Sequence, residues 1–316
     1  MELLTKQKNF SLISMDPETM SNHFAEDVKT GLTGTPKSLM SKYLYDEEGS
    51  RLFEEICTLE EYYLTRAERE ILQSQAANIS AKFSESISLV ELGSGNAEKT
   101  RLLIEAFLGQ FDELCYVPVD ISRTILEDSS LRLLEDFEGL EIKALWATYW
   151  QGLKHLNAEP DHPRLFLFLG SNIGNFEKEE AVDFLQSVCN IMSAQDRLLV
   201  GIDLRKNKEV LEAAYDDSRG VTAKFNLNIL TRINRELGGN FKREGFRHRA
   251  VYNEEIGRIE TYLVSRFPQT VYIEDLDLRI RFGARETIHT ENSYKYSFSE
   301  IDQLARDANL RVEERW

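Results

Sequence analysis

The sequence predicts an α/β fold in which a parallel sheet carries helices on both faces, with a smaller α+β lobe as a second part. Three observations support this prediction. Short apolar runs alternate with helix-period segments in the middle of the chain, which is the pattern of a parallel sheet covered by helices. A glycine-rich segment follows the first of these runs, where α/β proteins hold nucleotide-like ligands. After residue 203 the pattern changes to strand-like alternation with short turns, which is typical of antiparallel pairs.

Apolar runs and helix-period segments give the elements of the main sheet domain in order. Five strands are expected at 87–92, 115–119, 140–145, 165–169 and 198–202. Helices are expected between them at 98–107, 122–134 and 178–192. A further helix precedes the first strand, and Thr65 with Glu68 has the spacing of a capping box at its start.

The region after residue 203 predicts most of the second lobe. Two helices are expected at 209–215 and 222–237, followed by antiparallel strands at 247–252, 258–267 and 271–278. A last helix at 298–308 and a strand at 310–316 return to the main sheet. The sheet domain would then comprise 67–205 and 297–316, and the smaller lobe 1–66 and 206–296.

Composition excludes several classes of function. A formal net charge of -16 repels a phosphate backbone, so we expect no nucleic-acid partner. The N-terminus lacks the apolar run of a signal peptide, and no stretch reaches the roughly 20 apolar residues of a membrane span. Three dispersed cysteines suit a reducing compartment, and the five histidines never fall at metal-ligand spacing. We therefore expect a monomeric cytoplasmic protein with no membrane partner and no metal.

The loop after the first strand, VELGSGNAEKT (90–100), carries the clearest chemical signal. Gly93 and Gly95 let the backbone approach a ligand closely, which a Cβ would block. The dinucleotide fingerprint fails because position 98 is Glu, and a carboxylate there would repel a pyrophosphate. The same glycines are also compatible with a tight strand–helix turn that binds nothing.

Polar residues end two further strands at the same edge of the sheet. Asp120 ends the second strand, where a carboxylate can accept hydrogen bonds from both ribose hydroxyls, or can instead cap the following helix. The segment Gly170–Asn175 ends the fourth strand. Asn175 offers a donor and an acceptor, which suits the charged ends of an amino acid.

Five motifs together resemble one enzyme family over essentially the whole chain. They are the run PKSLMSKYLYDEEGSRLFEEICTLEEYYLTRAE, the loop ELGSGNAEKTR, and the segments FLGSNIGNF, AYDDSRGVTAKFN and TENSYKYS. The chain resembles the histidine-specific Nα-methyltransferases, which make hercynine (Nα,Nα,Nα-trimethylhistidine) in ergothioneine biosynthesis. The resemblance implies a Rossmann-like class I methyltransferase sheet that binds S-adenosyl-L-methionine, and a lobe that binds L-histidine. Because the family also contains dimethylallyltryptophan N-methyltransferases, tryptophan or a prenylated tryptophan is the alternative substrate.

The resemblance implies roles for particular residues. Those implied to bind the cofactor are Gly93, Gly95, Lys99, Asp120, Thr148 and Tyr149. Those implied to bind the backbone of the amino acid are Tyr62, Asn175 and Tyr215, with Glu291 and Ser293 on the imidazole ring. Those implied to line the substrate pocket are Tyr45, Phe53, Gly170 and Thr261. Asn175 would orient the acceptor nitrogen, and Tyr45 could relay its proton, so these two are the candidate catalytic residues.

The chain departs from the family pattern at three places. Thr148-Tyr149 stands where well-known bacterial members have Asp-Phe at the adenine, and Thr261 stands where they have Met near the histidine ring. The sequence also ends at Trp316, where the family continues into one more strand. Because the expected strand at 310–316 would need that partner, we expect the natural chain to be longer.

Overall fold

The structure, a computed structural model, describes residues 1–15, 17–156 and 162–316. The chain divides into two compact units, each assembled from segments that are distant in sequence. Unit 1 comprises Met1–Asp16, Leu64–Asp203 and Tyr296–Trp316. Unit 2 comprises Pro17–Tyr63 and Leu204–Lys295. The expected lobe at 1–66 is therefore corrected at its beginning, because the first residues join the sheet of unit 1.

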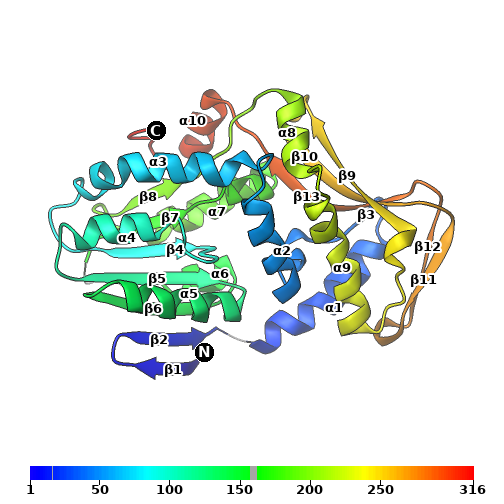
Figure 1. Cartoon of the computed structure of the whole chain (residues 1–316), viewed down its shortest axis with the longest axis horizontal. Helices are drawn as coiled ribbons and strands as arrows, with labels where there is room; N and C mark the ends of the chain where they lie inside the picture. Colours follow the sequence, from blue (N-terminus) through cyan, green and yellow to red (C-terminus); the bar gives the residue numbers. More distant parts are fainter. Residues whose placement is uncertain (16, 157–161) are drawn as a thin grey trace. The chain divides into compact units, whose positions relative to one another are not determined.

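Unit 1 is built on a seven-stranded sheet with the order β1-β2-β6-β5-β4-β7-β8 (Figure 1). Its strands are β1 (Glu2–Gln7), β2 (Phe10–Ser14), β4 (Ser88–Leu92), β5 (Leu114–Asp120), β6 (Leu140–Trp146), β7 (Arg164–Phe168) and β8 (Arg197–Val200). All neighbouring pairs are parallel except the hairpin of β1 and β2. Every residue of β7 is buried, as expected for a parallel strand covered on both faces. The predicted α/β fold with a parallel sheet is confirmed.

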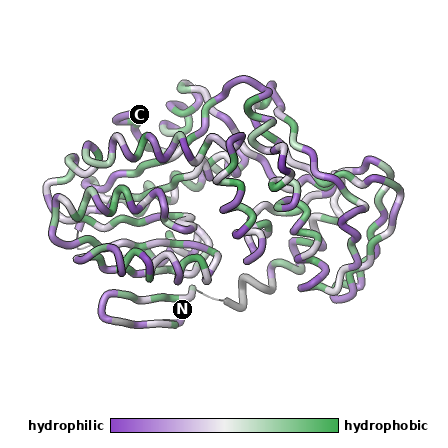
Figure 2. Tube along the Cα trace, in the orientation of Figure 1, coloured by the Kyte–Doolittle hydropathy of each residue, from purple (hydrophilic) through white to green (hydrophobic). Residues whose placement is uncertain are grey.

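Helices pack against this sheet and against one another. They are α3 (Tyr63–Ser80), α4 (Arg101–Leu108), α5 (Arg123–Asp136), α6 (Tyr149–His155), α7 (Lys178–Ile191) and α10 (Phe298–Asp307), with the short 3-10 helix η2 (Asn172–Asn175) after β7. In Figure 2 hydrophilic and hydrophobic residues alternate along these helices, which is the pattern of helices that turn one face toward a core. Because β4, β5, β6 and β7 run parallel, their carboxyl ends share one edge of the sheet.

The main sheet differs from the expected one in two ways. The hairpin of β1 and β2 was not expected, and it extends the sheet beyond β6. Residues 310–316 form no strand, although they alternate apolar and charged residues. Their side chains instead make surface ion pairs, such as Glu313 with Arg197 at 3.1 Å and Glu314 with Lys82 at 2.9 Å. Alternation alone does not make a strand, because a strand also needs a ladder of backbone hydrogen bonds.

Unit 2 contains a four-stranded sheet in the order β3-β13-β10-β9 and a separate hairpin of β11 and β12. The strands are β3 (Lys37–Ser38), β9 (Phe246–Asn253), β10 (Arg258–Ser265), β11 (Gln269–Ile273), β12 (Leu278–Phe282) and β13 (Thr287–Tyr294). The helices are α1 (Pro17–Thr33), α2 (Glu47–Cys57), α8 (Lys208–Tyr215) and α9 (Val221–Leu237), with 3-10 helices η1 (Ser41–Leu44), η3 (Arg243–Gly245) and η4 (Glu274–Leu276). The expected single strand at 271–278 is wrong, because η4 interrupts it and β11 pairs with β12. β13, which was not expected as a strand, pairs with β10.

Within the described residues, the helices are too short or too polar to cross a membrane.

Candidate active site

The glycine loop of unit 1 is held in a conformation that needs glycine. Gly93 has φ +79°, and a Cβ there would lie 2.8 Å from the hydroxyl oxygen of Tyr149. The backbone N–H of Gly93 donates to Val119 O at 2.8 Å. The N–H of Gly95 donates to Asp120 Oδ2 at 2.9 Å. The loop is therefore held at the end of β5, with open space at Gly95 and the side chain of Tyr149 against Gly93.

Asp120 accepts hydrogen bonds from two backbone N–H groups and has further acceptor positions on its carboxylate. Its Oδ1 accepts from the N–H of Ser122, the N-cap residue of α5, at 2.8 Å. Burial raises the pKa of Asp120, and the backbone N–H donors of Ser122, Gly95 and Ile121 oppose that rise. A carboxylate has about four acceptor positions. Asp120 can therefore hold the loop and the start of α5 while still accepting from ribose hydroxyls.

Glu91, on β4, forms buried hydrogen bonds that hold the far end of the glycine loop. Its carboxylate is 2% exposed and accepts from Thr100 Oγ1 at 2.6 Å and from the hydroxyl of Tyr116. Burial raises the pKa of Glu91 to about 7, against the opposing effect of these two donors. Thr100 precedes α4, so Glu91 joins β4 to the start of that helix and to β5.

Glu68 has a role in the site that the sequence did not indicate. Both of its carboxylate oxygens accept from the N–H of Gly170, at 2.8 and 3.0 Å, and one pairs with the ammonium of Lys99. α3 begins at Tyr63, so the expected capping box of Thr65 with Glu68 is wrong. The Glu68 carboxylate instead joins the predicted cofactor residue Lys99 to the predicted substrate residue Gly170.

Three other predicted residues of unit 1 lie at the same edge of the sheet. Thr148 is the N-cap of α6: its hydroxyl accepts from Gln151 N at 3.3 Å and donates to Gln151 Oε1 at 3.1 Å. Tyr149 packs edge-on against Phe168, with ring centroids 5.3 Å apart, and places its hydroxyl by Gly93. Asn175 is the last residue of η2 and is half-buried. A contact of Thr148 with adenine would compete with its capping bonds.

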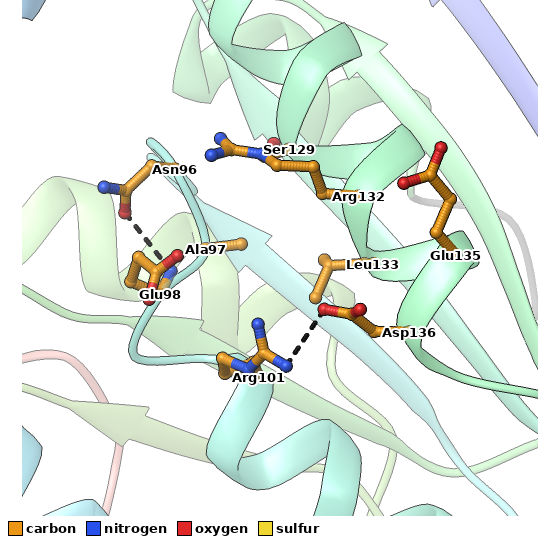
Figure 3. Close-up of a pocket in the computed structure, with 9 residues that line it drawn as sticks. All are labelled: Asn96, Ala97, Glu98, Arg101, Ser129, Arg132, Leu133, Glu135 and Asp136. Carbon is orange, nitrogen blue, oxygen red and sulfur yellow. Dashed lines mark hydrogen bonds and ion pairs between the residues drawn. The ribbon is translucent and has the colours of Figure 1, made fainter.

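A small cavity of about 170 Å³ lies between the glycine loop, the start of α4 and α5 (Figure 3). Residues from the loop, the start of α4 and one face of α5 line it: Asn96, Ala97, Glu98, Arg101, Ser129, Arg132, Leu133, Glu135 and Asp136. Arg101 and Asp136 form an ion pair across it at 3.0 Å. Its lining includes none of the predicted cofactor residues.

Unit 2 gathers five aromatic side chains from five parts of the chain. Four of them were predicted for the substrate pocket, and Phe225 of α9 was not. Ring centroids lie 5.3 Å apart for Tyr45 and Phe53, 5.3 Å for Tyr45 and Phe225, 6.2 Å for Phe53 and Tyr62, and 6.0 Å for Tyr62 and Tyr215. We call these five residues the aromatic cluster. Their ring faces offer a surface that attracts cations.

A carboxylate and a hydroxyl on β13 lie next to the aromatic cluster. Burial raises the pKa of Glu291 to about 7, and the charge of Lys295 opposes that rise. Burial also raises the pKa of Tyr62, and the charge of Glu291 adds to that rise. The register of β10 with β13 shifts just after Thr261, which pairs with Glu291. Such a bulge re-aims the side chains that follow it.

Ser293 and Tyr215 are joined by a hydrogen bond of 2.8 Å, and Lys295 donates to both hydroxyls at 2.9 Å. His248 fixes the backbone of Tyr215: its Nδ1 accepts from Asn226 Nδ2 at 2.9 Å, so its Nε2–H donates to Tyr215 O at 2.8 Å. Burial lowers the pKa of His248, in agreement with this neutral ring.

Lys295 was not among the residues predicted for the site. Ser293 and Lys295 follow Glu291 at a spacing of two, and this alternation is a signal that could have found Lys295.

The described residues contain no group of three or more His, Cys, Asp and Glu side chains that could hold a metal ion. Unit 1 instead fits S-adenosylmethionine: a Cβ at Gly95 would meet nothing within 4 Å, so a ligand can approach the backbone there, and the Asp120 carboxylate has acceptor positions beyond its bonds to Gly95 and Ser122. A parallel sheet with this loop after one strand and an acidic residue at the end of the next is the arrangement of a Rossmann-like domain that binds a nucleoside ligand, and S-adenosylmethionine-dependent methyltransferases are one class of such proteins.

The comparison with known families agrees with this class. The family described as "Histidine-specific methyltransferase, SAM-dependent" matches residues 24–316. The chain belongs to this family, so the resemblance noted from its motifs is confirmed.

Relatives are similar over most of the chain. The "Histidine N-alpha-methyltransferase" of Mycolicibacterium smegmatis is 39% identical over 291 residues, covering 92% of this chain and 89% of the relative. The protein of the same name from Mycobacterium tuberculosis is 40% identical over 288 residues, covering 88% of each. The "L-tryptophan methyltransferase trpM" of Psilocybe serbica is 31% identical over 320 residues, covering 93% of this chain and 89% of the relative.

Proposed function

We propose that this enzyme transfers methyl groups from S-adenosylmethionine to the α-amino nitrogen of L-histidine, three times in succession, to form hercynine. The observation that carries the proposal is the placement of Glu291 and Ser293 beside the aromatic cluster in unit 2. A carboxylate and a hydroxyl complement the polar ring of histidine, and aromatic faces complement a quaternary ammonium product. The names of the two mycobacterial relatives agree with this substrate.

Each methyl transfer is an in-line displacement. S-adenosylmethionine supplies an electrophilic methyl carbon on its sulfonium. The amine lone pair forms the new C–N bond while the C–S bond breaks, and the nitrogen loses a proton before it can accept the next methyl. The enzyme must therefore bind the amine in its neutral form and align it, and such positioning can contribute several kcal/mol to lowering the barrier.

Residues of both units have roles in this proposal. In unit 1, Asn175 orients the acceptor nitrogen, and Lys99 and Asp120 bind the cofactor. In unit 2, Tyr62 and Tyr215 bind the backbone of the amino acid. Tyr45, or a water molecule, takes the proton from the amine. These assignments agree with the clustering of each group within its own unit.

Glu291 binds the N–H of the substrate ring in this proposal. Its carboxylate accepts from a ring N–H, and a ligand without that N–H would leave a half-buried carboxylate unpaired, which is costly. The alternative substrate is tryptophan or a prenylated tryptophan, whose indole also carries an N–H. The relative from Psilocybe serbica and the presence of Thr261 in place of a Met favour this alternative.

Mass spectrometry of free amino acids after incubation with S-adenosylmethionine tests the proposal. L-Histidine should gain one, two and then three methyl groups, whereas L-tryptophan, L-tyrosine and L-phenylalanine should gain none or far fewer. Glu291→Ala should weaken histidine binding by about 1–3 kcal/mol and narrow its advantage over tryptophan. Glu286→Ala, which removes a glutamate paired with Lys37, is the matched control. Methylation of tryptophan without methylation of histidine would refute the assignment.

The setting of the enzyme forms a further part of the proposal. We propose that it acts in the cytoplasm, which the three dispersed cysteines favour. We also propose that it is a monomer, which light scattering after size-exclusion chromatography would test.

A further inference from the structure

Lys295 is a buried cation that donates hydrogen bonds to two hydroxyls. The residue is 1% exposed and follows β13 directly. Its ammonium donates to the hydroxyl oxygens of Tyr215 and Ser293, each at 2.9 Å, and lies 4.7 Å from the centre of the Tyr215 ring. Burying an ammonium costs several kcal/mol unless its surroundings compensate. The two hydroxyls and the charge of Glu291 are among the groups that compensate this cost.

Chemistry fixes the donor in two of the three hydrogen bonds among these groups, and either hydroxyl could donate in the third. An ammonium has donors and no acceptor, so both hydroxyl oxygens accept from Lys295. The two hydroxyls are also 2.8 Å apart, so one donates to the other. A phenol is the stronger donor and an aliphatic hydroxyl the stronger acceptor, which favours donation from Tyr215 to Ser293. Ser293 then accepts twice, from Lys295 and from Tyr215.

With both lone pairs engaged, Ser293 can offer a ligand only its hydrogen. Glu291, two residues earlier on β13, offers acceptor oxygens. Neutral imidazole carries one N–H and one nitrogen lone pair, and therefore matches this donor and acceptor together. Indole carries an N–H but no lone pair, so it can satisfy Glu291 and leaves the Ser293 hydrogen without a partner.

We propose that Lys295 is a positioning residue for substrate choice: by occupying the lone pairs of Ser293 and Tyr215, it makes Ser293 a donor and so selects imidazole over indole. The proposal rests on the proposed function, because it places the histidine ring at Glu291 and Ser293. It goes further by assigning the choice between the two rings to a residue that does not touch the ring. The charge of Lys295 also acts on Glu291 directly and favours its ionised form, which is an acceptor.

Calorimetry with four proteins tests the inference. Wild type, Lys295→Met, Lys295→Arg and Ser293→Ala are each titrated with L-histidine, L-tryptophan and S-adenosylmethionine. Lys295→Met should weaken histidine binding about tenfold and leave tryptophan binding nearly unchanged, so that the preference falls by about the same factor. Lys295→Arg, which keeps the donors, should retain more of the preference. Affinity for S-adenosylmethionine should not change, because the two hydroxyls that Lys295 donates to belong to predicted substrate residues.

A double-mutant cycle separates this role from simple support of β13. If Lys295 acts through Ser293, Lys295→Met should have little further effect on the preference in a Ser293→Ala background. Should Lys295→Met fail to fold, Ser293→Ala still tests the donor, since it removes the hydrogen itself and should lose the same preference.

Two failures can be told apart. A wild-type protein that does not bind histidine refutes the proposed function. A wild-type protein that binds histidine, with an unchanged histidine-to-tryptophan ratio in Lys295→Met or in Ser293→Ala, refutes the role of Lys295 alone.

Discussion

Glu68 and Gly170 lie 102 residues apart in the sequence, yet both carboxylate oxygens of Glu68 accept from the backbone N–H of Gly170. Gly170 follows β7 with φ +77°, at the turn that leads to Asn175. The same carboxylate pairs with Lys99. One glutamate on α3 therefore fixes a backbone turn and a cation that were predicted to serve two different ligands.

Removing the Glu68 carboxylate should destabilise the turn at Gly170 and leave Lys99 without this ion pair. Glu68→Ala leaves the N–H of Gly170 without its acceptor, and we expect a loss of about 1–3 kcal/mol in the free energy of unfolding. Glu68→Gln keeps an acceptor oxygen and should lose less. Urea unfolding measures both variants, with the exposed Glu70→Ala of the same helix as control. Equal stability of Glu68→Ala and Glu70→Ala would contradict the assigned role.

Asp120 should contribute to cofactor affinity beyond its structural bonds. Asp120→Ala should weaken S-adenosylmethionine binding by about 1.5–3 kcal/mol, because it removes a charged acceptor for the ribose. Calorimetry measures the affinity, and Asp136→Ala, which breaks a surface pair with Arg101, is the control. If cofactor binding survives while the melting temperature falls, Asp120 serves only the loop and the start of α5.

The aromatic cluster should bind the methylated product better than the substrate. Phe53→Leu keeps the apolar character but removes a ring face, so hercynine should lose about 0.5–2 kcal/mol of binding free energy relative to histidine. The matched control is Phe267→Leu, which changes an exposed ring of unit 2. Equal losses for the two ligands would show that the cluster contributes packing and no attraction for the cation.

The buried carboxyl of Glu291 should make stability depend on pH. Its pKa is raised from 4.5 to about 7 in the folded protein, so the folded state holds the proton more tightly than the unfolded state. The contribution of Glu291 to the free energy of unfolding therefore falls as pH rises from about 4.5 to 7, and is constant above that window. Glu291→Gln removes this titration, so its advantage over wild type should grow between pH 5 and pH 8 in urea unfolding.

Glu286 provides a control of opposite sign. The ammonium of Lys37 donates to Glu286 and holds its pKa below the usual value. Its contribution is present at neutral pH and is lost as pH falls, so Glu286→Gln should be less stable than wild type at pH 8. The pH assignment fails if the two glutamine variants respond to pH in the same direction.

The sequence predicted the core strands well because apolar residues dominate them, in a continuous run or in alternation. The apolar run at 165–169 became β7 (Arg164–Phe168), and the alternating segment at 140–145 became β6 (Leu140–Trp146). β1 and β2 were missed because they lie at one end of the sheet, and β2 acquires its place only by pairing with β6. β13 was missed because it carries Glu291 and Ser293, so the polar side chains that serve the site also obscure the strand pattern.

The site was predictable where its residues lie within local motifs. Gly93 and Gly95 follow from the loop itself, and their positive φ angles agree with that reasoning. Glu68 and Phe225 were missed because their partners are distant in sequence, and one sequence contains no record of such contacts. Lys295 was missed although it follows Glu291 and Ser293 at a spacing of two, because β13 was not recognised as a strand. Thr65 and Glu68 show the converse error, since a local capping pattern was interpreted without knowledge of a tertiary partner that binds the same carboxylate.

The discontinuous make-up of unit 2 has a consequence for biosynthesis. β3 pairs with β13, and the ammonium of Lys37, a residue of β3, donates to Glu286, which is 249 residues later in the sequence. At ordinary translation speeds, roughly 12–50 s pass between the emergence of these two positions from the ribosome. During that interval α1 and α2 are already made, while α9, which packs against α2, and β12, which packs against α1, are made only later. Nascent chains of this enzyme should therefore expose apolar helix faces for many seconds, and pulse-labelled ribosome-bound fragments ending before β13 should be captured by chaperones and cut readily by protease.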